Sequence, residues 1–236
     1  MSAHEVPPTG DLAAAIQAVV KAAGPKPVNV LVSKNIGLRV GDLADLGVNV
    51  VELMPVQAYG GNAAGWGYNP HLYFAPKPTY GSASDLRAFI DEAHAKGIAV
   101  WLDTVVNHYS GNSKAPLACY DGDCPNGAHG IYFFPPGPYA STPWGPRPDY
   151  TSPQVAAMLQ ATVPWWLEEN RGDGFRWDSV SNIRALDGQG ETPGGKELLV
   201  AVNDLTHAAG ALSIAEDLKG YDGITKAARS EEHTSE

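Results

Sequence analysis

The segment Gly174-Phe175-Arg176-Trp177-Asp178 places an arginine two residues before an aspartate in a stretch that favours a β-strand. Alternation with period two puts Gly174, Arg176 and Asp178 on one face and Phe175 and Trp177 on the other. The guanidinium group favours an ionised carboxyl group, so we expect it to lower the pKa of Asp178, which suits a nucleophile. A structural Arg–Asp pair at the end of a strand explains this segment alone equally well.

Two further segments place an acidic residue directly after an apolar run. Ile98–Leu102 leads into Asp103, and Leu212–Ala215 leads into Glu216. A continuous apolar run is typical of a strand that is buried on both faces, as parallel sheets require. Because the carboxyl ends of parallel strands meet at one edge, these two acids and Asp178 are expected to converge.

Two carboxylates on neighbouring strands can carry out glycoside hydrolysis with retention of configuration. One attacks the anomeric carbon and the other protonates the leaving oxygen, and their carboxyl groups stand roughly 5–5.5 Å apart. Asp178, beside Arg176, is the predicted nucleophile. Glu216 follows an apolar strand, where loss of hydration would favour its protonated form, so it is the predicted acid/base.

The elements that must position these acids alternate between strands and helices. Strands are expected near residues 28, 48, 98, 174 and 212, and helices at 11–21, 38–46, 82–97, 193–209 and from Ser152 onwards, with an interruption at Pro164. This order predicts a parallel α/β fold, and the acids at the strand ends favour a (β/α)₈ TIM barrel. A doubly wound sheet is the alternative, but no glycine fingerprint for a dinucleotide follows the first strand.

A barrel closes with eight strands, so the sequence predicts an incomplete barrel that holds about the first five. We interpret residues 1–228 as one partial catalytic domain. Within it, 59–80 is expected to be a glycine-rich loop, and 109–150 a long Gly/Pro-rich insertion typical of functional loops. The final residues 229–236 resemble a translated sequencing-library adapter and are interpreted as a non-native tail.

Composition limits the partners that this chain is expected to have. The net charge of −10 disfavours nucleic acids and anionic membranes and fits a neutral or cationic ligand. The first residues lack a basic segment followed by an apolar run, and no apolar stretch reaches transmembrane length, so a cytoplasmic location is expected.

The two cysteines, Cys119 and Cys124, lie five positions apart in a polar segment. They could form a small disulfide or half of a metal site. No second Cys or His pair with zinc spacing accompanies them, so free thiols are the favoured interpretation.

Three separated motifs resemble signature regions of the α-amylase family (glycoside hydrolase family 13). They are Asp103-Thr104-Val105-Val106-Asn107-His108, Gly174–Asp178 and Ile214-Ala215-Glu216-Asp217-Leu218, in the order that the family has them. The resemblance covers roughly residues 40–226. The segment Trp66-Gly67-Tyr68-Asn69-Pro70, followed by Tyr73-Phe74-Ala75-Pro76 and Tyr80-Gly81, is most similar to the branching-enzyme and trehalohydrolase side of the family.

The resemblance implies a role for each matched residue. Asp178 would be the nucleophile and Glu216 the acid/base, with Arg176 orienting Asp178. The implied substrate is an α-1,4-linked glucan, either a polysaccharide or an oligosaccharide. Branching, by chain transfer to form α-1,6 bonds, is favoured over the hydrolysis of starch or malto-oligosaccharides because of the Trp66–Tyr80 segment.

The resemblance also implies roles for residues around the catalytic pair. His108 and Tyr68 would contact the sugar at the cleaved bond, and Asp103 would hold the site together through hydrogen bonds. No cofactor is required by such a reaction. Asn107 is a calcium ligand in some members of the family, so it is a candidate calcium ligand here.

The chain also departs from the family's pattern, and rival functions stay open. The fourth signature region has no counterpart in this sequence, and residues 1–40 match the family's first strand poorly. Because five strands leave an open edge where the barrel should close, the chain by itself is expected to be weakly active or inactive. A relative that binds glucan without catalysis would not need both Asp178 and Glu216. A metal-dependent hydrolase built on Asp103, His108 and Asp178 lacks a second histidine at a strand end.

Overall fold

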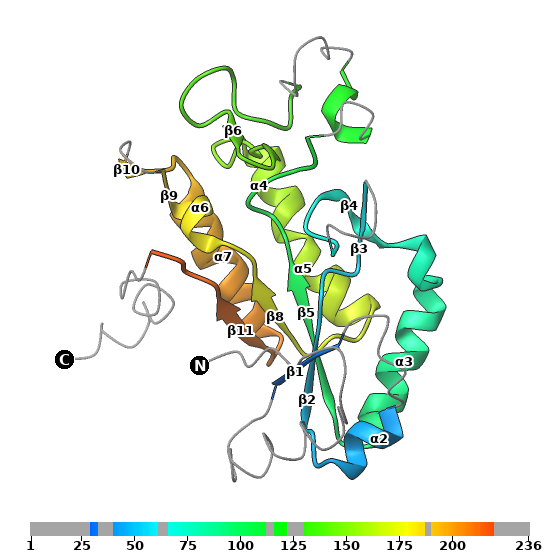
Figure 1. Ribbon diagram of the computed structural model, residues 1–236. Coiled ribbons are helices and arrows are strands. Elements are labelled where there is room, and N and C mark those ends of the chain that lie inside the picture. The colour runs from blue at the N-terminus through cyan, green and yellow to red at the C-terminus, as the bar shows by residue number, and fades with distance from the viewer. Residues whose placement is uncertain are drawn as a thin grey trace, which may run out of the picture.

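The computed structural model describes residues 29–32, 40–60, 66–111, 116–121, 130–186 and 190–219. At its centre lies a five-stranded sheet in the order β1-β2-β5-β8-β11, in which each pair of neighbours is parallel (Figure 1). The strands span Asn29–Val32 (β1), Val50–Leu53 (β2), Ala99–Thr104 (β5), Gly174–Trp177 (β8) and Leu212–Ala215 (β11). The predicted strands are therefore confirmed, and their sequential parallel order is that of a partial (β/α) barrel.

Strand β1 lies at one edge of the sheet. It pairs in parallel with β2, with Asn29 opposite Val50 and Val32 opposite Leu53. A short apolar run is enough to extend a parallel sheet, because the hydrogen bonds of the ladder come from the backbone and not from particular side chains.

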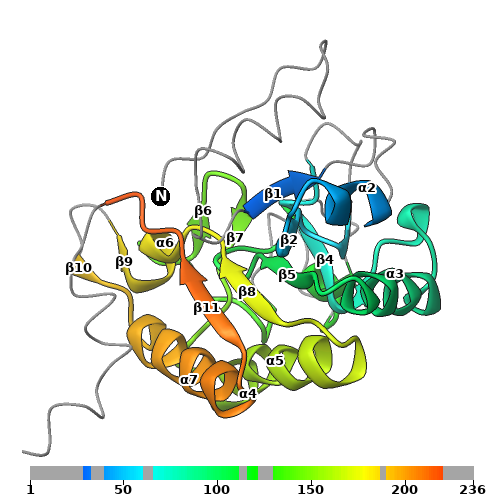
Figure 2. The ribbon, with the colours of Figure 1, turned by 90° about the horizontal axis from the view of Figure 1, so that it is seen from below.

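The helices lie mainly on one face of the sheet, as the view in Figure 2 shows for α3, α4, α5 and α7. They span Val40–Asp45 (α2), Ala83–Ala95 (α3), Pro153–Gln160 (α4), Thr162–Pro164 (α5), Val180–Arg184 (α6) and Gly195–Ala208 (α7). Phe175 and Trp177 are buried in the hydrophobic core, while Arg176 between them belongs to a polar cluster. The period-two pattern predicted for β8 is confirmed.

The predicted helix boundaries follow from local capping. Ser82 and Asp85 form the expected capping box at the start of α3, since each side chain accepts a hydrogen bond from the backbone N–H of the other residue. The Ser152 side chain accepts from Val155 N at the start of α4. Near Pro164 the helical path changes into a π-helical turn, Trp165–Glu169 (η4), because proline cannot donate to the preceding turn.

Two connections between the main strands contain regular structure. Residues 59–80, predicted as a loop, include part of an antiparallel hairpin of β3 (Gln57–Tyr59) and β4 (Pro70–Pro76), followed by a 3₁₀ turn, Pro78–Tyr80 (η2). Proline at both ends of β4 and register shifts in the pairing hide the alternation that would have indicated strands. The segment between β8 and α7 contains the short helix α6 and the strand pair of β9 (Ala185–Leu186) and β10 (Gly190–Glu191).

The insertion at 109–150 carries little regular structure in its described part. It contains a 3₁₀ turn, Pro116–Cys119 (η3), and a hairpin of β6 (Ser141–Thr142) and β7 (Gly145–Pro146). The helix predicted at 11–21, Cys124 and the tail at 229–236 lie outside the described residues. None of the helices in the described ranges combines the length and the apolar composition that a membrane span needs.

Candidate active site

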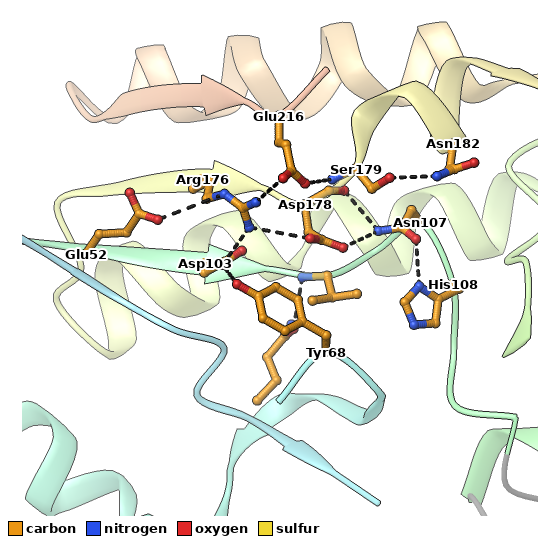
Figure 3. A network of polar contacts seen from close by, with 12 residues as sticks. Glu52, Tyr68, Asp103, Asn107, His108, Arg176, Asp178, Ser179, Asn182 and Glu216 are labelled. Atoms are coloured by element: carbon orange, nitrogen blue, oxygen red, sulfur yellow. Dashed lines mark hydrogen bonds and ion pairs between the residues drawn. The ribbon is translucent and has the colours of Figure 1, made fainter. Parts of the chain in front are cut away.

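The guanidinium group of Arg176 lies at the centre of a cluster of four carboxylates (Figure 3). Its Nη1 atom is 2.6 Å from Asp103 Oδ2 and 3.4 Å from Asp178 Oδ1. Its Nη2 atom is 2.7 Å from Glu216 Oε1, and its Nε atom is 3.9 Å from Glu52 Oε1. One cation is thus shared by acids from four strands or strand ends.

Sheet register explains why these residues meet. Asp103 on β5 lies directly opposite Arg176 on β8. The ladder continues one residue past two strands, since Asp178 N donates to Thr104 O at 3.0 Å and Glu216 N donates to Trp177 O at 3.1 Å. The predicted convergence of the acids at the carboxyl edge of the sheet is therefore confirmed.

Asn107 and His108 extend the hydrogen-bond network on from Asp178. Asn107 Nδ2 donates to Asp178 Oδ2 at 2.7 Å and to its backbone oxygen at 2.9 Å. His108 Nδ1 lies 2.6 Å from Asn107 Oδ1. Burial of the imidazole lowers the pKa of His108 to about 4, a shift that the backbone of Tyr68 partly offsets. The ring is therefore neutral near pH 7, and its Nδ1–H donates to Asn107.

Asp103 holds Tyr68 and Arg176 together. The Tyr68 hydroxyl donates to Asp103 Oδ2 at 2.6 Å, and the Arg176 guanidinium carbon is 5.9 Å from the centre of the Tyr68 ring. Burial raises the pKa of Asp103 to about 6, although Arg176 and the Tyr68 hydroxyl both oppose this shift. Burial also raises the pKa of Tyr68, with a further contribution from the charge of Asp103.

The pKa of Asp178 departs from the expected direction. Burial and then the neighbouring charge of Asp103 raise the pKa of Asp178 to about 7, and they outweigh the opposing effects of Asn107 and Arg176. Arg176 does lower the pKa of Asp178, but the expectation of a pKa below the ordinary value was wrong because the net shift is upward. The physical reason is the burial of the Asp178 carboxylate, and Arg176 offsets it only in part because its Nη1 atom lies closer to Asp103 than to Asp178.

The environment of Glu216 also differs from the expected one. Its side chain is 31% exposed, whereas that of Asp178 is 13% exposed, so the predicted proton donor is the more hydrated of the two acids. Strand β11 lies at the edge of the described sheet, which leaves Glu216 open on one side. Glu216 Oε2 accepts a hydrogen bond from Ser179 N at 2.9 Å.

Glu52 and Ser179 were missed by the sequence analysis. Glu52 is the one charged residue in the strand predicted at 48–53, and an acid within an apolar strand could have identified it. Burial raises the pKa of Glu52, while Arg176 lowers it. Ser179 has a φ of 46°, a left-handed conformation that turns its N–H toward Glu216, and no sequence signal predicts it.

The described residues do not supply an obvious calcium site at Asn107. Its amide oxygen accepts from His108 and its amide nitrogen donates to Asp178, so both ends of the side chain are engaged. No group of three or more His, Cys, Asp or Glu side chains in the described ranges could hold a metal ion. Calcium prefers six to eight oxygen ligands, and this arrangement does not fit that preference. The calcium prediction itself stays untested.

The structure thus brings together every predicted site residue: Tyr68, Asp103, Asn107, His108, Arg176, Asp178 and Glu216. They form one continuous network of hydrogen bonds and ion pairs, with no predicted residue left outside it. The roles that the resemblance assigns to them stay predictions. Chemically, the network offers two carboxylates beside one cation and an aromatic ring at the same edge of the sheet.

Comparison with known proteins supports the family that the sequence motifs resemble. Residues 36–121 match the model of the alpha-amylase catalytic domain. The chain is 36% identical over 198 residues to the 1,4-alpha-glucan branching enzyme GlgB of Nocardia farcinica, covering 76% of this chain and 25% of that protein. It is 33% identical over 181 residues to the malto-oligosyltrehalose trehalohydrolase of Saccharolobus solfataricus, covering 74% of this chain and 28% of that protein.

A solved structure supports the fold. The crystal structure of a protein described as an alpha amylase from Salmonella typhimurium superposes with a TM-score of 0.60 at 30% sequence identity. The match covers 75% of this chain and 27% of that one. The chain spans about a quarter of the length of the curated relatives that it matches.

Proposed function

Because the chain belongs to the alpha-amylase family, we propose that its carboxylate cluster cleaves α-1,4-linked glucans with retention and transfers the cleaved chain, as glucan branching requires. One observation carries the proposal. Asp178 and Glu216 follow neighbouring parallel strands, and both contact the guanidinium group of Arg176. A site that only bound glucan would not need two acids in this arrangement.

In the first step, an oxygen of ionised Asp178 attacks the anomeric carbon of a glucosyl unit. The bond from that carbon to the glycosidic oxygen breaks, and Glu216 gives its proton to the departing oxygen. Asn107 and Arg176 fix the position of Asp178, and Tyr68 offers an aromatic face for the sugar. Glu216 must leave its ion pair with Arg176 to act as the proton donor.

In the second step, ionised Glu216 takes a proton from an incoming hydroxyl group, whose oxygen attacks the same carbon and releases Asp178. If the hydroxyl group belongs to water, the result is hydrolysis. If it is the 6-hydroxyl of another glucan chain, the result is an α-1,6 branch. Similarity to branching enzymes supports transfer as the main outcome, and hydrolysis of starch or malto-oligosaccharides is the alternative.

The charge of the site supports a neutral ligand. Four carboxylates surround a single arginine, so an anionic ligand would meet repulsion, whereas a neutral sugar would meet hydrogen-bonding groups and an aromatic ring. Neither chemical step above uses a metal ion. If Asn107 did hold calcium, millimolar calcium would raise the melting temperature, and Asn107→Ala would abolish that increase.

The test is to incubate a protein that carries this chain at the full length of its branching-enzyme relatives with amylose, while iodine absorbance and new reducing ends are measured. A fall in absorbance with few new reducing ends indicates branching, and a fall with many indicates hydrolysis. Asp178→Asn and Glu216→Gln should abolish either activity, whereas Asp173→Asn, a change outside the cluster, should preserve it. If amylose were unchanged and still bound equally by wild type and both variants, catalysis would be ruled out in favour of glucan binding.

A further inference from the structure

Arg184 and Asp217 form an ion pair that the proposed mechanism does not use. Arg184 Nε donates to Asp217 Oδ2 at 2.6 Å, and Arg184 Nη2 donates to Asp217 Oδ1 at 3.0 Å. The Arg184 side chain is 14% exposed and the Asp217 side chain is 7% exposed. Two parallel hydrogen bonds from a guanidinium group fix the orientation of a carboxylate as well as its distance. Because Asp217 directly follows the predicted acid/base, Glu216, this pair fixes the chain next to a residue that must transfer a proton.

Asp217 is held in its charged form. Burial by itself would raise the pKa of Asp217, but hydrogen bonds from Arg184 and from the Lys219 backbone, together with the charges of both residues, lower it below its ordinary value. Lys219 N donates to Asp217 Oδ1 at 2.8 Å, and Lys219 Nζ donates to the oxygen of Ala185, the residue that follows α6, at 3.3 Å. The segment after β11 is therefore attached to the carboxyl end of α6 through both Asp217 and Lys219.

The amino end of α6 contacts Glu216 itself. Ser179 N donates to Glu216 Oε2 at 2.9 Å, and Val180 N donates to the backbone oxygen of Glu216 at 2.9 Å. The left-handed turn at Ser179 is held by Asn182, whose Nδ2 atom donates to Ser179 Oγ at 2.7 Å (Figure 3). Because Ser179 directly follows Asp178, one short helix begins beside the predicted nucleophile and contacts the predicted acid/base.

This arrangement matters because the two acids need a defined separation. Retention requires the two carboxyl groups to stand roughly 5–5.5 Å apart. Glu216 must also turn away from Arg176 to protonate the leaving oxygen, so its side chain has to move while its backbone stays in place. In the described sheet β11 pairs with β8 alone, and α6 adds a second restraint on the residues that follow β11.

We propose that Arg184 is a positioning residue that orients Glu216, through Asp217, for protonation of the glycosidic oxygen. This proposal rests on the glucan activity proposed above. Arg184 need not touch the sugar, because its two hydrogen bonds to Asp217 fix the backbone from which the Glu216 side chain extends. Loss of the pair should let that backbone shift, so that Glu216 meets the leaving oxygen less often in the correct geometry. Attack by Asp178 should be affected much less, since its carboxylate is held by other side chains.

Two substrates of the full-length protein separate protonation from nucleophilic attack. Amylose releases a sugar oxygen that needs the proton from Glu216, whereas α-maltotriosyl fluoride releases fluoride, which departs with little help from an acid. Arg184→Gln should lower kcat on amylose about tenfold or more, but should lower the rate of the first burst of fluoride release less than about threefold. Steady-state assays on amylose and quenched-flow measurement of fluoride give the two values.

Two further variants provide the controls. Arg184→Lys keeps a positive charge that can donate to Asp217 but loses the paired geometry, so it should recover part of the activity on amylose that Arg184→Gln loses. Arg171→Gln removes another arginine that pairs with an aspartate, Asp91, but this arginine is 54% exposed and precedes the amino end of β8. Arg171→Gln should change both rates less than about twofold.

The outcomes separate this proposal from the proposed function. An equal fall on both substrates would mean that Arg184→Gln disturbs the whole site, and an unchanged kcat on amylose would mean that the pair contributes nothing to catalysis. Either result would overturn the positioning role and leave the glucan function standing. If wild type acted on neither substrate, both proposals would fail. Circular dichroism checks folding, and Asp217→Asn, which removes the same pair, should show the same difference between substrates if Arg184→Gln is unstable.

Discussion

At each end of strand β8, an arginine stands two residues before an aspartate, but the surroundings of the two pairs differ. Arg171-Gly172-Asp173 precedes the strand, and Arg176-Trp177-Asp178 ends it. At the amino end, Arg171 pairs with Asp91 of α3, and Asp173 lies 2.7 Å from His94 of the same helix. At the carboxyl end, a single arginine is shared by four acids.

The difference between the two ends lies in solvation and in the balance of charge. The Arg171 side chain is 54% exposed and each charge there has its own partner, whereas the Arg176 side chain is 17% exposed and is outnumbered by its acids. Exposed pairs contribute little to stability because water screens them, while buried acids with too few cations must shift their pKa values. Position along the strand, and not the motif, therefore decides which pair can do chemistry.

Replacing Arg176 and Arg171 separately should give the largest difference in the free energy of unfolding. We expect Arg176→Gln to lower the free energy of unfolding by about 3–5 kcal/mol at pH 8, because several carboxylates lose the cation that pairs with them in the described part of the chain. Arg171→Gln should change it by about 0–1 kcal/mol. Urea denaturation measures both. The Arg176→Gln deficit should shrink at pH 4, where Asp103 and Asp178 are protonated, and an equal deficit at both pH values would contradict this explanation.

Replacing Asp178 and Asp173 separately by asparagine should change the free energy of unfolding at pH 8 in opposite directions. The folded-state pKa of Asp178 is raised to about 7, so the stability that it contributes at low pH is lost as pH rises from about 4 through about 7. Asp178→Asn should therefore raise the free energy of unfolding by roughly 1–3 kcal/mol at pH 8 and leave it nearly unchanged at pH 4.

The matched change at the amino end is Asp173→Asn. Asp173 Oδ2 accepts from Val100 N at 2.7 Å and pairs with His94, so this variant should lower the free energy of unfolding by up to about 1 kcal/mol. Thermal unfolding of both variants at pH 8 checks the comparison. A loss of stability in Asp178→Asn at pH 8 would show that its carboxylate is better accommodated than its burial suggests.

The pH dependence of catalysis should reflect ionisation of Asp178 at the carboxyl end of β8, and not ionisation of Asp173 at its amino end. Attack by Asp178 requires its ionised form, so turnover of amylose should rise between about pH 6 and 8 as a group with a pKa of about 7 ionises. Asp173→Asn should leave this limb of the pH profile in place. A profile already flat from pH 5 upward would mean that Asp178 is ionised well below the expected range.

Glu52 should give the smallest effect, because its carboxylate is 3.9 Å from Arg176 Nε. The charge of Glu52 adds to the raised pKa of Asp103, so Glu52→Gln should move the pKa of Asp103 downward from about 6. Carboxyl ¹³C chemical shifts followed through a pH titration would measure this change. An unchanged pKa of Asp103 would show that Glu52 acts on Arg176 only.

Sequence patterns predicted the sheet and its acidic edge well, because both depend on local signals. Apolar runs marked the strands, and the position of each acid at a strand end predicted Asp103, Asp178 and Glu216 as neighbours. The hairpin of β3 and β4 escaped prediction because proline and register shifts break its alternation. The pKa of Asp178 was predicted in the wrong direction because the sequence shows its neighbour Arg176, but neither the burial of its carboxylate nor the other acids that share that cation.

The shared guanidinium group also bears on how this chain folds. Glu52, Asp103, Arg176 and Glu216 come from four segments that are far apart in the sequence, so their cluster cannot form until β2, β5, β8 and β11 have all paired. Pairing of distant segments is slow because long loops must close first. The acids repel one another until Arg176 arrives between them. Assembly of the site should therefore be a late kinetic event, and refolding should be faster at mildly acidic pH than at alkaline pH.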